Sequence, residues 1–248
     1  MRFPGDGMLL REKTGEGRKG PGTARHAGED AFVIGKGAQK KMAEARERIG
    51  ELRAWAPGRP LDAWLGGLAD KALGEISGLL REALEKGAPV KDVAALKIEA
   101  SAAYADACIR CMEAVAAEGV DLLTLGDYRV AVDRNVLAIE GISPTKQYPG
   151  ESEYRPVEKA QGKIFDLYRA WGLCLVNTYL DHERKVQSGR PFSDSEAYCQ
   201  ATDAFNSALA RADYMERTQE TLDKKDKLMG EISLIMSGNW PYLKKEKK

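Results

Sequence analysis

Apolar residues recur at every third or fourth position through most of the chain beyond residue 38. In one such stripe Ile164, Trp171 and Tyr179 fall on one side of a helix, because about 3.6 residues make one helical turn. The alternation of apolar and polar residues that indicates a strand is nearly absent. The sequence therefore predicts an all-α protein, a multi-helix bundle of about six long helices.

Glycines and prolines divide the chain into segments. Residues 1–37 hold nine glycines and two prolines with little periodic apolar content, which predicts a flexible Gly-rich arm. We expect an N-terminal helical region over 38–141, followed by a linker loop over 142–156 that contains three prolines. The remaining segments are a C-terminal helical hairpin over 157–237 and a basic tail over 238–248.

Two blocks in the second half of the chain, 90–140 and 157–213, share an order of features. Each has a long amphipathic helix, a polar link and a second helix, so each predicts a helical hairpin. Long helices with few aromatic residues often need a partner to cover their apolar stripes. We therefore expect a homo-oligomer.

Charge is balanced over the whole chain, with 38 basic and 38 acidic residues, so no overall attraction to nucleic acid or anionic lipid is expected. The ends are basic: residues 1–41 hold nine Lys or Arg against five Asp or Glu, and four of the last five residues are lysines. Such ends are typical of an anionic partner or of a solubilising tail. No apolar run approaches the ~20 residues of a membrane span, and the first residues, which include Arg2 and Asp6, do not predict a secretory signal. With four cysteines and no disulfide-rich pattern, we expect a cytoplasmic protein.

The cysteines give the sharpest local motif. Cys108 and Cys111 form a C-x-x-C whose thiols lie about one turn apart on a helix, and with Cys174 and Cys199 they could offer four sulfur ligands to zinc or an iron–sulfur cluster. All four also occupy positions on apolar faces, where cysteine packs as a small hydrophobic residue. We favour packing in the core and expect no metal.

Catalytic signatures are missing from the sequence. It has two histidines, His26 and His182, and contains no H-E-x-x-H, no G-x-S-x-G and no phosphate loop ending in G-K-[ST]. Carboxylates such as Glu44 and Glu47 alternate with basic residues at helical spacing, as on a solvated helix face. We predict that the protein is not an enzyme and has no cofactor.

Two features favour nucleic acid as a ligand. Residues 76–94 have the outline of a helix-turn-helix, with Lys86 and Lys91 near the turn, although ordinary helical hairpins share this outline. Further along, basic residues lie near Tyr148 and Tyr154, and such mixtures can contact phosphates and stack on bases. The six candidate nucleic-acid-binding residues are Lys86, Lys91, Lys146, Arg155, Lys159 and Lys163.

A family resemblance covers about residues 58–146. Its features, in order, are Gly58-Arg59-Pro60, Tyr104-Ala105-Asp106-Ala107, Glu118-Gly119, Asn135 and Gly141-Ile142-Ser143-Pro144-Thr145-Lys146. This order resembles the small subunits of phage DNA-packaging terminases, in which a helical hairpin precedes a closing G-[LI]-[ST]-P segment. The resemblance implies a non-catalytic, ring-forming protein that recognises duplex DNA and passes it to a motor subunit. The present chain carries in addition a second hairpin, 157–236.

Two functional hypotheses follow from the sequence. The first is a non-enzymatic, oligomeric helical protein that binds nucleic acid, of the viral DNA-packaging or assembly kind, whose affinity for DNA falls steeply with salt. The second is a helical adaptor or scaffold that docks a protein partner on exposed apolar stripes.

Overall fold

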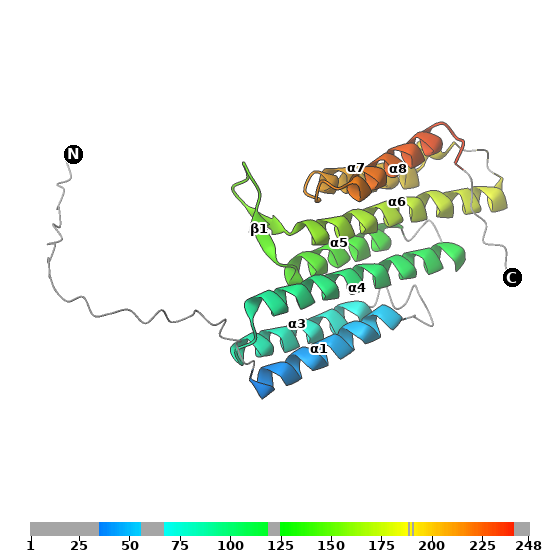
Figure 1. Ribbon diagram of the computed structural model, residues 1–248. Coiled ribbons are helices and arrows are strands. Elements are labelled where there is room, and N and C mark those ends of the chain that lie inside the picture. Colours follow the sequence, from blue (N-terminus) through cyan, green and yellow to red (C-terminus); the bar gives the residue numbers. More distant parts are fainter. Residues whose placement is uncertain (1–34, 56–66, 119–124, 188, 190, 241–248) are drawn as a thin grey trace, which may run out of the picture. The chain divides into compact units, whose positions relative to one another are not determined.

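The computed structural model describes residues 35–55, 67–118, 125–187, 189 and 191–240, and these are almost entirely helical (Figure 1). The all-α prediction is confirmed. The described α-helices are α1 (Lys36–Ala54), α3 (Leu68–Glu85), α4 (Val90–Glu118), α5 (Leu125–Ile142), α6 (Glu158–Val186), α7 (Glu196–Ala212) and α8 (Gln219–Met236). A 3-10 turn, η2 (Phe192–Asp194), precedes α7.

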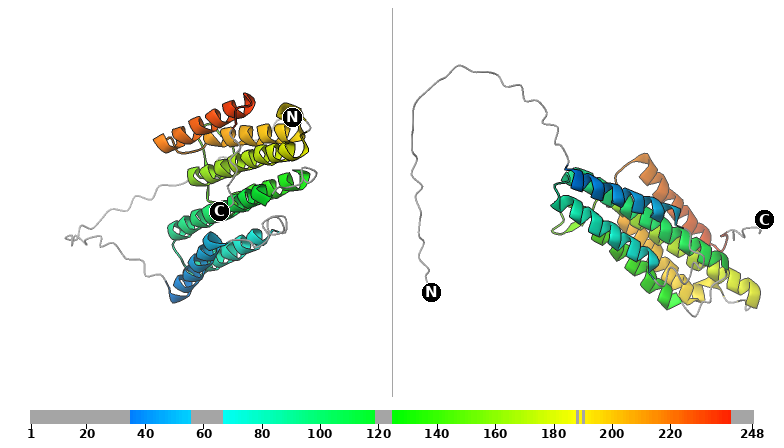
Figure 2. Two further views of the ribbon diagram at one scale, coloured as in Figure 1. Left: turned by 90° about the vertical axis from the view of Figure 1, so that its right-hand side faces the viewer. Right: turned by 90° about the horizontal axis from the view of Figure 1, so that it is seen from below.

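The helices belong to one compact unit, Ile34–Lys248, and pack as successive pairs. The predicted hairpins are the pairs α4–α5 and α6–α7, and a third pair, α1–α3, comes before them. Figure 2 shows the pairs as layers, with α8 added beyond α7. Within the stack α4 is central, because it packs against α1, α3, α5 and α6.

Buried apolar stripes hold these layers together. Ile164, Trp171 and Tyr179 of α6 are all buried, as their spacing predicts. Helices α6 and α7 approach especially closely at Gly172, where an added Cβ would overlap the ring of Phe205. Small residues along α7 favour the same close approach, since five of its buried positions are alanines: Ala197, Ala201, Ala204, Ala208 and Ala212. The close contact of α6 with α7 therefore depends on glycine and on small side chains.

Helix ends agree with the sequence in part. Gly87, whose place at the end of an apolar helical stripe predicts a left-handed cap, has φ 85° after α3, so this prediction is confirmed. The start of α7 differs from expectation: the spacing of Ser193 and Glu196 predicts a capping box, but Ser193 lies in η2. Ser195 is the N-cap instead, accepting a hydrogen bond of 3.1 Å from the backbone N–H of Tyr198.

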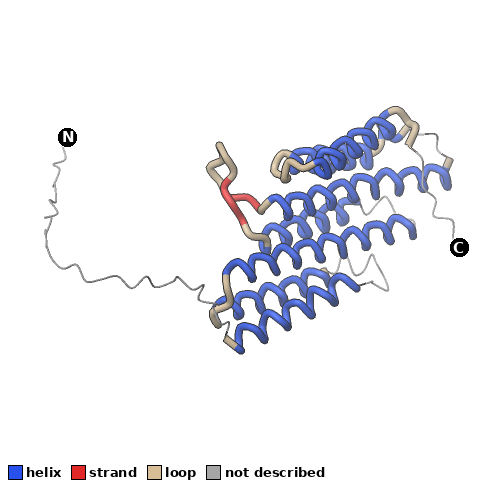
Figure 3. The backbone as a smooth tube through the Cα atoms, in the orientation of Figure 1, coloured by secondary structure: helices blue, strands red, loops and turns tan. Residues whose placement is uncertain are grey.

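The segment 142–156, predicted as a plain loop, contains a β-hairpin (Figure 3). Strands β1 (Thr145–Gln147) and β2 (Tyr154–Pro156) pair antiparallel, with Lys146 opposite Arg155. Three-residue strands are too short for an alternating pattern to stand out among turn residues, so sequence reasoning missed them. Three predicted segments lie outside the described residues. They are a helix expected to begin at Pro60, because proline suits the first helical turn, the part of the arm up to residue 34, and the part of the tail beyond residue 240.

A polar cluster lies inside the otherwise apolar contact of α3, α4 and α5. The hydroxyl of the fully buried Tyr104 donates to Asp70, and Arg134 pairs with the same carboxylate at 2.7 Å. The phenol oxygen also lies 2.9 Å from the side-chain amide of buried Asn135. A hydroxyl has one proton, so the Asn135 amide is best oriented with its N–H toward Tyr104, which also gives the otherwise unpaired Nδ2 a partner.

Candidate functional site

The predicted nucleic-acid residues on the hairpin lie together but are neutralised. Lys146 pairs with Glu158 at the start of α6 and sits 4.5 Å from the ring centroid of Tyr148. Arg155, opposite it on β2, pairs with Glu151 at 3.2 Å. Two like charges facing each other across a hairpin are unfavourable, so these carboxylates stabilise the turn. Both cations are therefore engaged within the protein.

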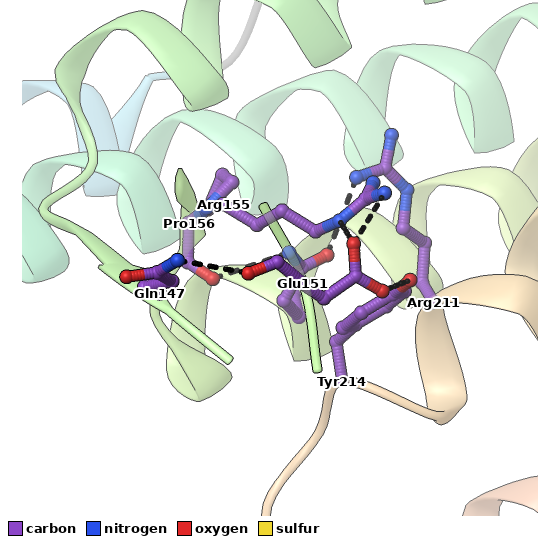
Figure 4. A network of polar contacts seen from close by, with 7 residues as sticks. Gln147, Glu151, Arg155, Pro156, Arg211 and Tyr214 are labelled. Carbon is purple, nitrogen blue, oxygen red and sulfur yellow. Dashed lines mark hydrogen bonds and ion pairs between the residues drawn. The ribbon is translucent and has the colours of Figure 1, made fainter. Parts of the chain in front are cut away.

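The same hairpin is fastened to the end of α7. Figure 4 shows Arg155 and Tyr214 converging on Glu151, whose carboxylate accepts a hydrogen bond of 3.0 Å from the Tyr214 hydroxyl. The guanidinium of Arg155 also stacks on the Tyr214 ring, 4.8 Å from its centroid. Tyr148 adds an edge-on ring contact with Tyr214. These contacts hold the β-hairpin against the end of α7. The protein's own cations also cover the aromatic faces of Tyr148 and Tyr214.

Two further candidates are also paired. Lys163 of α6 donates to Asp106 of α4 at 2.8 Å, and Lys86, the C-cap residue of α3, lies 3.9 Å from Glu82 of that helix. Surface pairs contribute roughly 0–1 kcal/mol, but they lower the charge offered to a phosphate. Four of the six predicted residues therefore already have a carboxylate partner.

Lys91 and Lys159 are the two candidates with no ion pair to a described residue, and both are exposed. The structure does not bring them together. Helices α4 and α6 run parallel, and the Lys163–Asp106 pair places Lys159 beside position 102 of α4. Lys91 is 11 residues before that position, about 16 Å away at 1.5 Å per residue. They do not form one basic patch.

The packing of α4 restricts the surface that a helix-turn-helix at residues 76–94 could present to DNA. Its second helix would be α4, which has helices on several sides and buries residues along its whole length, from Val93 to Val115. A recognition helix needs one exposed face to enter the major groove. In α4 exposed positions recur at Lys91, Ala95 and Glu99 over its first turns, whereas residues 100–112 include no exposed position.

The cysteines are core residues in three cases out of four. Cys108, Cys111 and Cys174 are buried, whereas Cys199 is exposed, so the expectation of an apolar-face position is wrong for Cys199. Burial raises the pKa of the Cys111 thiol to about 11 and that of Cys174 to about 12, and it raises the pKa of Cys108 as well. The buried thiols are therefore protonated and weakly nucleophilic at neutral pH. No group of three or more His, Cys, Asp or Glu in the described ranges is arranged to hold a metal ion.

A small cleft, which we name the α5–α7 cleft, opens between α5 and α7. Its volume is about 60 Å³. Tyr168 and Trp171 of α6 line it, and the exposed pair Arg129–Asp203, 3.9 Å apart, bridges the two helices. The remaining lining residues are Val132, Asp133, Gln200, Ala204 and Ser207.

Gln200 is the unusual residue of this cleft. Its amide nitrogen donates to the carboxylate of Glu196 at 3.0 Å, and because a carboxylate only accepts, the orientation of the amide is fixed. Its oxygen Oε1 is buried and has no hydrogen-bond partner among the described residues. A buried unpaired acceptor costs about 1–3 kcal/mol. Sequence reasoning missed this cleft, because Gln200 stands in an ordinary alanine-rich helix.

Helix α8 carries the largest share of the exposed apolar side chains. Its inner face buries Leu228 and Ile235, and Arg169 of α6 donates to Glu231 at 2.7 Å. On the outer side three residues spaced by seven, which we name the α8 seam, are half exposed: Leu222 52%, Met229 51% and Met236 59%. The sevenfold spacing was a signal available in the sequence, but only the structure shows that about half of each side chain stays exposed, although the Tyr198 hydroxyl of α7 contacts the sulfur of Met236 at 3.3 Å.

No protein-family model matches the chain, and neither a curated protein nor a solved structure matches it. The resemblance to terminase small subunits stays a prediction. Among the helices that the structure describes, none has both the length and the apolar content needed to cross a bilayer.

Proposed function

We propose that the protein is a non-enzymatic helical scaffold that associates with a second copy of itself through the α8 seam. The α8 seam is the observation that carries the proposal. In stacked helical proteins the terminal layer needs a polar outer face to remain soluble alone. Here the last layer presents Leu222, Met229 and Met236 instead.

The geometry of the seam supports a symmetric pair. In an antiparallel arrangement centred on Met229, Leu222 of one copy lies opposite Met236 of the partner subunit, and Met229 lies opposite itself. Such a surface is self-complementary, as a two-fold interface requires. Covering the exposed half of three side chains contributes about 2–5 kcal/mol before the cost of association. Methionines suit this role, since they adapt their shape to a facing surface.

Size-exclusion chromatography of the full chain, with the mass measured by light scattering, tests this proposal. We expect the wild type to elute with twice the 27.2 kDa chain mass, and Met229→Glu to elute as a monomer. Lys227→Glu is the matched control on the polar side of α8 and should remain a dimer. A monomeric wild type at all concentrations, or a dimeric Met229→Glu, would overturn the proposal.

Cross-linking tests the register. Met229→Cys in a Cys199→Ser background should form a disulfide-linked dimer under mild oxidation, because the two thiols meet at the two-fold axis. Lys227→Cys in the same background should not, since position 227 lies on another face of the helix. Equal cross-linking of both variants would exclude the antiparallel register.

Nucleic-acid binding by an oligomer of the terminase small-subunit type is the second candidate, supported by exposed Lys91 and Lys159. Their charges are not neutralised by described residues, and a repeated copy would multiply them. Fluorescence anisotropy with a labelled duplex, at 50 and 200 mM salt, tests it. Binding that weakens with salt and is lost in Lys91→Glu/Lys159→Glu would support it. Binding that survives this double substitution, or none at low salt, would count against it.

A further inference from the structure

We propose that the α5–α7 cleft binds the guanidinium head of an arginine side chain presented by a partner polypeptide. This inference goes beyond the proposed self-association and does not depend on it. The site is polar, lies between two helices and holds an acceptor that the protein itself leaves unpaired.

Charge is the first argument. The cleft is lined by the carboxylates of Asp133 and Asp203 and by one cation, Arg129, so acceptors outnumber cations. Asp133 has no basic partner among the described residues, and the Arg129–Asp203 contact is long and solvent-exposed. A pair of that kind is weak and readily exchanged. The electrostatics therefore favour a cationic ligand.

The unpaired acceptor is the second argument. Oε1 of Gln200 is turned away from Glu196 and is closed off from solvent in this structure. An N–H donor that enters the cleft would satisfy it once the Gln200 side chain turns toward the ligand, and would remove the free-energy cost of leaving it unpaired. Of the ionised groups, guanidinium is the one with several donors in a fixed plane, so a single head can pair with Asp203 and with a Gln200 side chain turned in this way.

Size and shape are the third argument. A volume of about 60 Å³ is far below the roughly 300–1,000 Å³ of ordinary small-molecule sites, and fits the head of one side chain. Half-buried Tyr168 provides an aromatic ring in the lining, and arginine stacks on such a ring better than lysine does. Trp171 is only 3% exposed, so it serves as a reporter of the cleft and not as a stacking surface. Arg129, already paired across the mouth, then acts as an internal competitor that a partner's arginine displaces.

The experiment uses the full chain labelled with 5-fluorotryptophan, observed by fluorine NMR. The chain has four tryptophans, and Trp171→Phe identifies the resonance of the cleft. We expect the peptide acetyl-Gly-Arg-Gly-amide to shift this resonance saturably, the lysine peptide to do so more weakly, and acetyl-Gly-Gln-Gly-amide to leave it unchanged. No saturable shift with the arginine peptide, or an equal shift with the glutamine peptide, would overturn the proposal.

Substitutions at the cleft show whether each residue strengthens or weakens binding of the arginine peptide. Asp203→Asn should weaken binding of the arginine peptide about tenfold, the usual effect of losing one charge-assisted hydrogen bond. Arg129→Ala should strengthen it severalfold by removing the competitor, whereas Arg217→Ala, an equal change of charge outside the cleft, should not. Equal gains from Arg129→Ala and Arg217→Ala would mean that only overall charge matters, and would overturn the site.

A third variant tests the acceptor itself. Gln200→Met should weaken binding of the arginine peptide. Gln200 is buried, so this variant could fail to fold. In that case Asp203→Asn, a substitution at an exposed position, still tests the cleft. Free agmatine is the last comparison. If agmatine shifts the Trp171 resonance and the peptide does not, the cleft is a site for a small guanidine and the partner role is excluded.

Discussion

At the residue scale, Tyr104 is the side chain on which the interior polar cluster depends. Its hydroxyl donates to Asp70 on α3 and reaches Asn135 on α5, so one group links three helices. Burial raises the pKa of Tyr104 strongly, and the neighbouring Cys108 and Asp70 add to the shift, so the phenol stays protonated and acts as a donor.

Tyr104→Phe should lower the free energy of unfolding by about 1–3 kcal/mol, because Asp70 and Asn135 then lose a partner in a largely buried setting. Urea denaturation followed by circular dichroism measures this. Tyr154→Phe, at an exposed position of the hairpin, is the control and should leave the midpoint unchanged. A Tyr104→Phe variant as stable as wild type would show that the cluster contributes no net stability.

Glycine substitutions at two positions should act in opposite directions. Gly172→Ala should destabilise by about 1–3 kcal/mol, since its methyl would enter the space of the Phe205 ring. Gly230→Ala, at an exposed site of α8 with no atom near the new methyl, should stabilise by about 0.5–1 kcal/mol. Thermal unfolding of both variants checks the pair. Destabilisation by both would mean that helix α8 needs Gly230 for another reason.

At the element scale, sequence periodicity predicts much of the fold. The stripe through Ile164, Trp171 and Tyr179 identifies α6 and its buried face, because a long helix shows its pattern over several turns. The hairpin of β1 and β2 could not be predicted in the same way. It is held by contacts distant in sequence, such as Tyr214 with Glu151, which no local pattern reveals.

The candidate site was less accessible to sequence reasoning than the helices. The charge of Lys146 and Arg155 and their neighbouring aromatic residues predict nucleic-acid contacts, but charge in a sequence does not show whether a carboxylate lies opposite. Gln200 gave no signal, since an unpaired acceptor exists only relative to a packed surrounding. Charge pattern predicts which residues are basic, and tertiary packing decides which of them are available.

Helix α8 is attached to the stack through a polar contact as well as apolar ones. Arg169 of α6 binds Glu231 through both carboxylate oxygens, and Glu231 is only 9% exposed. Glu231→Ala should therefore release α8 locally, by about 1–3 kcal/mol, because a partly buried guanidinium loses its partner. Hydrogen exchange should quicken in α8 and remain slow in α4. Equal loss of protection in both helices would indicate global rather than local unfolding.

At the scale of the whole molecule, the central helix of the stack is covered by its neighbours, whereas α8 leaves apolar side chains exposed. Helix α4 is covered by four other helices, whereas α8 contacts α7 and α6 on one side and exposes the α8 seam on the other. A last helix with an exposed apolar seam favours association of two folded chains. The free energy of this association should then add to the stability of the folded chain, since only folded molecules can pair.

Stability should accordingly depend on protein concentration. If two copies pair through the α8 seam, each tenfold rise in concentration should raise the wild-type Tm by about 1–3 °C, because mass action favours the folded dimer. Met229→Glu should unfold at a Tm that does not change with concentration, while Lys227→Glu should behave as wild type. Differential scanning calorimetry over a hundredfold range measures all three. A wild-type Tm independent of concentration would mean that the seam contributes nothing to stability, and that its apolar residues serve a partner other than a second copy.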